Sequence, residues 1–160
     1  MMSLDDFNAV GEQEAAERLR TCLDVQRWID QVLAGRPYGD LDALLSVARN
    51  AAVEMTDEEL AAALARHPRI GEKAGAGHDA EFSSREQAGV EASDAERLVE
   101  GNRAYEARFD RVFLIRAAGR TSGEILAECE RRLGNDDETE RAETIEQLTQ
   151  IALLRLEQVI

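Results

Sequence analysis

The chain has 160 residues and carries 33 acidic side chains against 19 Lys and Arg, which gives a formal net charge of −14. Binding to nucleic acid relies on clustered cations, so this balance argues against a nucleic-acid partner. Apolar residues make up 44% of the sequence and aromatic residues 4%. Such usage, dominated by Ala, Leu, Glu and Arg, favours a helical globule over a disordered chain.

Helix start signals divide the first part of the chain. Ser3, Asp24 and Asp40 each precede an apolar periodic stretch and can cap a helix, while Thr56 and Glu59 have the spacing of a capping box. These signals predict helices over residues 4–10, 12–23, 25–34, 41–55 and 57–66.

The pattern then changes at residues 67–82, HPRIGEKAGAGHDAEF, which show no helical stripe. Long irregular segments inside compact domains often carry function, so we expect chemistry here. Helices resume after Ser83 and Ser93, a further capping box begins at Thr121, and the last helix is predicted over 137–159.

The only strand-like run is Val112 to Ile115. One short strand cannot form a sheet, so we expect extended chain or a continuation of the preceding helix. The sequence therefore predicts an all-α fold, a single-domain helical bundle of about eight to nine helices over residues 1–160.

His67 is the first candidate for chemistry, because it follows a predicted helix and precedes Pro68. The negative end of a helix favours a protonated imidazole, and a group that titrates near neutrality suits proton transfer. A histidine that merely caps the helix fits the same position. The second histidine, His78, has no partner pattern, so no metal site is predicted.

Ser83 and Glu86, in the run SSREQ, allow two interpretations. The S-x-x-E spacing is that of a capping box, and spacing alone favours a cap over catalysis. The choice between Ser83 and Ser84 as the cap decides whether Glu86 faces the backbone or a ligand.

Arg155 lies on or beside the apolar stripe of the last predicted helix. Its guanidinium must extend to solvent, pair with an acid or bind an anion, and pairing is the commoner outcome. Asn102 occupies an apolar face in the same way, and we expect a buried amide with hydrogen-bond partners.

The sequence indicates the cytoplasm as the location. The start, MMSLDDFNAV, is acidic and unlike a signal peptide, and no apolar run is long enough to cross a membrane. Cys22 and Cys129 lie outside any metal-ligand spacing, so we expect reduced thiols.

Ordered motifs run through nearly the whole chain. Together they resemble the OHCU decarboxylase family, where OHCU is 2-oxo-4-hydroxy-4-carboxy-5-ureidoimidazoline. The motifs are FNAV (7–10), AAERLRTC (15–22), RPY (36–38), LDALLSVA (41–48), HPRIGEK (67–73), SSREQAG (83–89), NRAYEARF (102–109), FLIRAAGR (113–120), RLGN (132–135) and IALLRL (151–156).

The resemblance implies an all-α bundle, often a homodimer, that acts in urate breakdown after uricase and hydroxyisourate hydrolase. Its substrate is a small anionic ureidoimidazoline, and its product is (S)-allantoin, formed without a metal or an organic cofactor. The family's catalytic histidine falls on His67, followed by Pro68, and its Ser-x-x-Glu-Gln motif falls on Ser83, Glu86 and Gln87.

The resemblance also implies roles for the later motifs. The arginine of the last-helix motif falls on Arg155, and main-chain groups of one segment would line the pocket: Phe113, Leu114, Ile115, Arg116 and Ala117. Many members have glycine where this chain has Asp110, and if that position has a positive φ, Asp tolerates it better than most residues.

These residues predict a mechanism. We expect Arg155 to bind the anionic or ureido end, His67 and Glu86 to act as acid and base, and Ser83 and Gln87 to hold the ring. Two alternatives remain: a related decarboxylase with another small ureido or imidazole substrate, and a non-catalytic helical interaction module. In the module, SSREQ is only a cap and Arg155 pairs with Glu, whereas the enzyme requires a pocket among residues 67–82, 83–90 and the last helix.

Overall fold

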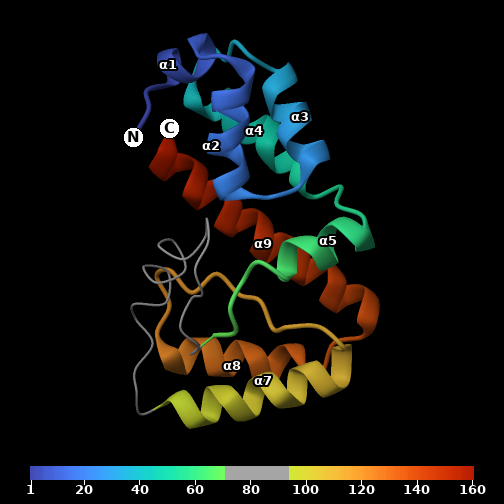
Figure 1. Ribbon diagram of the computed structural model, residues 1–160. Helices are drawn as coiled ribbons and strands as arrows, with labels where there is room; N and C mark the ends of the chain where they lie inside the picture. Colours follow the sequence, from blue (N-terminus) through green and yellow to red (C-terminus); the bar gives the residue numbers. More distant parts are fainter. Residues whose placement is uncertain (71–93) are drawn as a thin grey trace. The chain divides into compact units, whose positions relative to one another are not determined.

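The structure, a computed structural model, describes residues 1–70 and 94–160. These residues form helices and connecting loops without any strand, so the predicted all-α class is confirmed (Figure 1). The helices are α1 (Leu4–Ala9), α2 (Glu12–Cys22), α3 (Gln26–Ala34), α4 (Leu41–Ala52), α5 (Asp57–Leu64), α7 (Ala95–Phe109), α8 (Ser122–Arg132) and α9 (Asp137–Val159).

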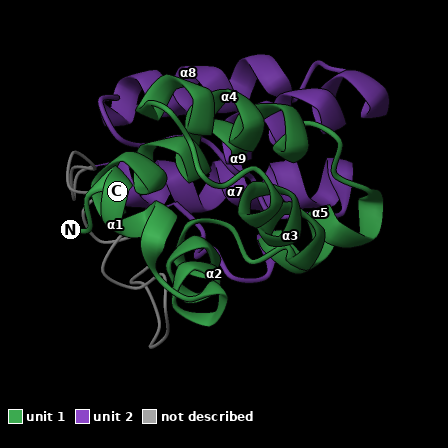
Figure 2. Cartoon of the chain, turned by 90° about the horizontal axis from the view of Figure 1, so that it is seen from above, with its two compact units in different colours: residues 1–63, 149–160 green, residues 64–148 purple. Residues whose placement is uncertain are grey.

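The chain divides into two compact units, residues 1–63 with 149–160 and residues 64–148 (Figure 2). Helix α9 contributes its first half to the second unit and its second half to the first. The single domain over residues 1–160 stays a prediction. In the described ranges, no helix combines the length and the apolar character that a bilayer crossing requires.

Side-chain caps begin several helices where the sequence predicts them. The Ser3 hydroxyl accepts the N–H of Asp6 at 3.1 Å, and the Asp40 carboxylate accepts the N–H of Ala43 at 2.8 Å. Thr56 and Glu59 form the reciprocal capping box, with distances of 2.9 and 3.2 Å. These bonds satisfy N–H groups that have no partner within the helix.

The predicted cap at Asp24 is wrong. Helix α3 begins after Val25, which offers no side-chain cap, and the Asp24 carboxylate accepts a bond from the Arg20 guanidinium at 3.0 Å. A charged donor one turn earlier on α2 is a stronger partner than a backbone N–H. Helices α4 and α5 also end sooner than predicted, at Ala52 and Leu64.

The first unit is built on α2, α3 and α4, which pack against one another. The buried Trp28 of α3 donates its indole N–H to the carbonyl of Ala48 in α4 at 2.9 Å. Asn8 and Tyr38 exchange two hydrogen bonds, at 2.9 and 2.8 Å, which attach the loop after α3 to α1. The motifs FNAV and RPY therefore hold this unit together.

The second unit packs α7 against α8. At its centre the Tyr105 ring lies 4.8 Å from the Phe109 ring and 5.1 Å from the Phe113 ring, centroid to centroid. The members of the buried cluster are Ile70, Leu98, Tyr105, Phe109, Phe113, Ile115, Ala117, Ile125, Leu126 and Cys129. Ile70 follows α5, and Phe113, Ile115 and Ala117 follow α7, so the irregular segments after both helices pack into this cluster.

Candidate functional site

The structure places some of the predicted site residues. His67 and Pro68 are half-buried directly after α5, in the second unit, and Arg155 lies on the part of α9 that belongs to the first unit. Ser83, Glu86 and Gln87 lie outside the described residues. The predicted convergence of His67, Glu86 and Arg155 therefore stays a prediction.

His67 extends the last turn of α5, because its backbone N–H donates to the carbonyl of Leu64 at 3.1 Å. This is the helix-terminal position that the sequence predicts. Pro68 follows directly, and a proline disfavours helical geometry at the residue before it.

The segment after Pro68 is attached to α7 at two points. The buried Asn102 donates its side-chain N–H to the carbonyl of Ile70 at 3.0 Å. One turn along the same helix, Glu106 accepts two bonds from the guanidinium of Arg69, at 2.5 and 3.3 Å. The prediction of a hydrogen-bonded buried amide at Asn102 is confirmed, and its partner is the chain that leads from His67.

The strand-like run is neither helix nor strand, so it does not continue the preceding helix. Two residues before it, Asp110 ends α7 in the left-handed conformation, with φ 56° and ψ 37°. A positive φ explains why glycine suits this position, and Asp is among the residues that tolerate it best. The helix thus ends abruptly, and residues 111–120 continue without helix or strand.

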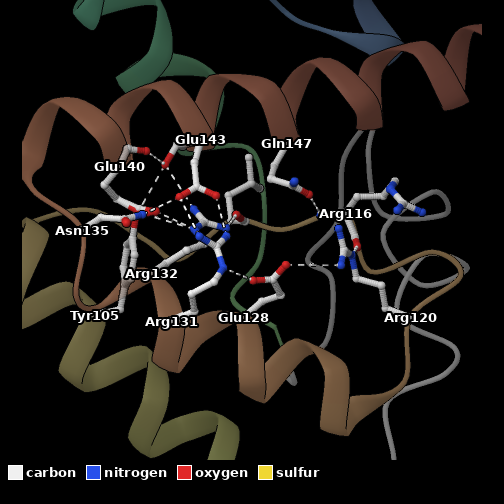
Figure 3. Close-up of polar contacts among 12 residues, drawn as sticks. Tyr105, Arg116, Arg120, Glu128, Arg131, Arg132, Asn135, Glu140, Glu143 and Gln147 are labelled. Atoms are coloured by element: carbon white, nitrogen blue, oxygen red, sulfur yellow. Dashed lines mark hydrogen bonds and ion pairs between the residues drawn. The ribbon is translucent and has the colours of Figure 1, made fainter.

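Side chains from neighbouring helices hold the backbone of this segment (Figure 3). Arg132 of α8 donates to the carbonyl of Leu114 at 2.8 Å, and Gln147 of α9 accepts the N–H of Arg116 at 3.0 Å. The carbonyl of Arg116 accepts a bond from Arg120 at 2.9 Å. The described residues contain no strand that could pair with this segment, so these side chains form the hydrogen bonds to its backbone that a neighbouring strand would form in a sheet.

The second unit also contains a buried ion pair that sequence reasoning missed. Arg132 and Glu140 are 1% and 0% exposed, and the Arg132 Nε lies 2.5 and 3.1 Å from the two carboxylate oxygens. The Arg132 Nη2 donates to Thr144 at 3.3 Å, and the guanidinium lies 4.7 Å from the Phe113 ring centre. Each of the three guanidinium nitrogens of Arg132 therefore has a hydrogen-bond partner, which offsets the cost of burying this charge.

Burial affects the titration of groups around this pair. It raises the pKa of the Glu140 carboxyl, while the hydrogen bond and charge of Arg132 act in the opposite direction. Burial also raises the pKa of the Tyr105 hydroxyl and of the Cys129 thiol. The signal for Arg132 was available in helical phase, because it follows Ile125 and Cys129 on one buried face of α8.

Arg155 is 1% exposed and lies among buried residues of α9 that include Ala152 and Leu156. The predicted position on the apolar stripe is confirmed. A buried guanidinium is stable only with polar or anionic partners, and on a chain with a net charge of −14 it provides a local positive charge.

Comparison with known proteins identifies the family. The sequence model of the OHCU decarboxylase family matches residues 8–157, and the chain belongs to this family. The chain is 24% identical to the 2-oxo-4-hydroxy-4-carboxy-5-ureidoimidazoline decarboxylase of Haloferax volcanii, across 97% of this chain and 94% of that protein.

Two further similarities place the chain in context. It is 24% identical to the uric acid degradation bifunctional protein of Bacillus sp. (strain TB-90), over 99% of this chain, and spans about a third (32%) of that protein's length. A solved structure of an OHCU decarboxylase in the presence of (S)-allantoin shares the fold, with a TM-score of 0.72 and 24% identity over 89% of this chain and 96% of that one.

Proposed function

We propose that this chain is a carboxy-lyase that converts 2-oxo-4-hydroxy-4-carboxy-5-ureidoimidazoline to (S)-allantoin in urate catabolism, without a cofactor. The observation that carries the proposal is the family match over residues 8–157, which includes the positions of His67, Glu86 and Arg155. The name of the Haloferax relative and the (S)-allantoin present with the solved relative support the substrate and the product.

The chemistry needs little more than placement. The bond to the carboxylate breaks and CO2 leaves, while the electron pair of that bond moves into the adjacent ring C=N. A proton is then delivered to one face of the ring carbon, and the hydroxyl loses its proton to become the carbonyl of allantoin. Because the ring itself accepts the electrons, the protein has to position the anion, stabilise the developing charge and supply the proton.

We assign the steps to the predicted residues. His67 and Glu86 act as acid and base, Arg155 binds the anionic or ureido end, and Ser83 and Gln87 hold the ring. The position of His67 at the end of α5 and the burial of Arg155 support these roles. A desolvated guanidinium interacts with an anion more strongly than an exposed one.

Main-chain groups of residues 113–117, together with Pro68, complete the proposed pocket lining. The non-helical form of this segment supports the role, because a helix would have used its N–H and C=O groups internally. We further propose a cytoplasmic homodimer, on the strength of the family resemblance, which sedimentation velocity at micromolar concentration tests.

A coupled assay tests the function. Urate, uricase and hydroxyisourate hydrolase generate the substrate, and the protein is added last. Spontaneous decay gives racemic allantoin, so we expect a circular dichroism signal of the (S) product that grows in proportion to the amount of protein. Racemic product formed at the uncatalysed rate would contradict the proposal. Prior dialysis of the protein against EDTA should leave the rate unchanged if no metal takes part.

A further inference from the structure

We propose that Gln147 and Arg132 are positioning residues of the decarboxylase, which fix the main chain of residues 114–116 in the orientation that binds substrate. The inference rests on the proposed function, in which this segment lines the pocket. The family resemblance assigned no role to either side chain. Both lie in the same compact unit as the segment.

Gln147 controls one peptide group directly. Its side-chain oxygen, reaching from α9, accepts the N–H of Arg116 at 3.0 Å, and the carbonyl of Arg116 is held by the Arg120 Nε at 2.9 Å (Figure 3). Because side chains bond both its N–H and its C=O, the main chain of Arg116 is fixed in orientation, although it lies in neither helix nor strand.

Arg132 controls the neighbouring carbonyl. Its Nη1 donates to the carbonyl of Leu114 at 2.8 Å, its Nε bonds Glu140 and its Nη2 bonds Thr144, while the Phe113 ring centre lies 4.7 Å from the guanidinium. The carboxylate of Glu140 neutralises and orients the guanidinium, so the donor to Leu114 cannot turn away. A lysine would keep the charge but could not reach these partners at once.

The arrangement has a consequence for catalysis. Loss of one of these bonds frees a peptide plane to rotate without removing an apolar side chain from the core. A misplacement of about 1 Å in a group that contacts substrate can reduce the rate by about a hundredfold. For Gln147, a positioning role therefore predicts a loss of turnover and of product stereochemistry with little loss of stability, whereas a change at Arg132 also disturbs its buried ion pair with Glu140.

Gln147 offers the sharper test, because it is half-buried and its replacement leaves no buried charge. Gln147→Met removes the acceptor at similar size, and Gln147→Glu keeps an oxygen for the Arg116 N–H. We expect Gln147→Met to lower kcat by about tenfold or more, with reduced enantiomeric excess of allantoin and an unchanged melting temperature. Gln147→Glu should retain kcat and enantiomeric excess.

Amide hydrogen exchange at Arg116 provides a readout that does not depend on activity. Exchange should accelerate in Gln147→Met and stay slow in Gln147→Glu. Wild-type kcat and enantiomeric excess in Gln147→Met would overturn the inference, as would equal losses in both variants. If the wild-type protein itself fails to accelerate the reaction, the proposed function falls, and this inference falls with it.

Arg132→Lys tests the second residue, with Arg108→Lys as a control for the loss of a guanidinium. Because Arg108 is 44% exposed and Arg132 1%, the melting temperature of both variants is measured alongside kcat. Arg108 also bonds a carboxylate, Asp137, and a backbone carbonyl, that of Asn135, and lies 4.5 Å from a ring centre, that of Phe109. It does not hold the 114–116 segment. We expect kcat to fall about tenfold or more in Arg132→Lys and to stay at the wild-type value in Arg108→Lys. Equal effects in the two variants would overturn the role of Arg132.

Discussion

The side-chain amide of Asn102 donates to the main-chain carbonyl of Ile70 at 3.0 Å, across 32 positions of sequence. Helix α7 thereby holds the stretch of chain that begins at His67, and the ion pair of Arg69 with Glu106 adds a second attachment one turn away. Asn102 and Glu106 therefore hold the chain within three residues of His67.

Asn102→Ala should destabilise the protein by about 1–3 kcal/mol, because the buried carbonyl of Ile70 loses its donor. Urea denaturation measures the change, and we also expect a lower kcat from the displaced His67. The exposed neighbour Arg103 gives the control, since Arg103→Ala should change stability by less than about 0.5 kcal/mol. Equal stability of Asn102→Ala and wild type would show that the bond contributes nothing.

His67→Asn should lower kcat by about 10²- to 10⁴-fold, the usual contribution of a positioned acid or base. Because His67 is only half-buried, the melting temperature should change little. The measurement is the rate and the circular dichroism of the allantoin formed. Full activity with unchanged stereochemistry would remove His67 from the mechanism and leave it as a helix-terminal residue.

Arg155→Ala should raise KM strongly, because the anionic substrate loses its guanidinium partner. Since Arg155 is buried, stability has to be followed in the same samples, and Arg155→Lys separates charge from shape. We expect KM in the order wild type, Arg155→Lys, Arg155→Ala, from lowest to highest. An unchanged KM in a variant that is merely less stable would assign Arg155 to the core.

Asp110 should accept glycine and reject β-branched residues, because its φ is 56°. Asp110→Gly is expected to match or exceed the wild-type melting temperature, whereas Asp110→Val should cost about 1–2 kcal/mol in left-handed backbone strain. Thermal denaturation of the two variants side by side checks this. Equal stability of the valine and glycine variants would contradict the left-handed end of α7.

Glu143 should contribute a stability that disappears in acid. The hydrogen bond from Arg131 is the largest cause that lowers the pKa of the Glu143 carboxyl below its ordinary value. A lowered folded-state pKa means that the contribution is present above the unfolded-state pKa, about 4.3, and is lost as the pH falls through the folded-state pKa. The difference in the free energy of unfolding between wild type and Glu143→Gln should therefore shrink as the pH falls from about 6 to about 3. A constant difference would contradict this.

Local signals predicted the helices well, because a cap depends on residues three positions apart. The caps at Ser3, Asp40 and Thr56 are of this kind. The cap at Asp24 failed because the carboxylate had a competing donor, Arg20, which the spacing rule does not weigh.

Long-range pairing was harder to predict. Arg131 and Arg132 are adjacent and chemically identical, yet the first side chain is 52% exposed and the second 1%. Only their helical phase distinguishes them, and the choice of Glu140 among 33 acidic residues depends on how α8 and α9 are joined. Local position singled out His67 and Arg155 one at a time, but a site that contains both was proposed from the family resemblance, because no spacing rule links positions so far apart.

The division of α9 between the two units has a consequence for biosynthesis. Residues 64–148 form one unit and are contiguous, so all of them are translated before residues 149–160. The other unit needs residues 149–160 in addition to residues 1–63. The bond from the Met2 N–H to the carbonyl of Val159, at 3.1 Å, can form only after residues 149–160 have left the ribosome. The portion of the chain that is made first must therefore wait longest for its final contacts, which reverses the usual order of co-translational folding.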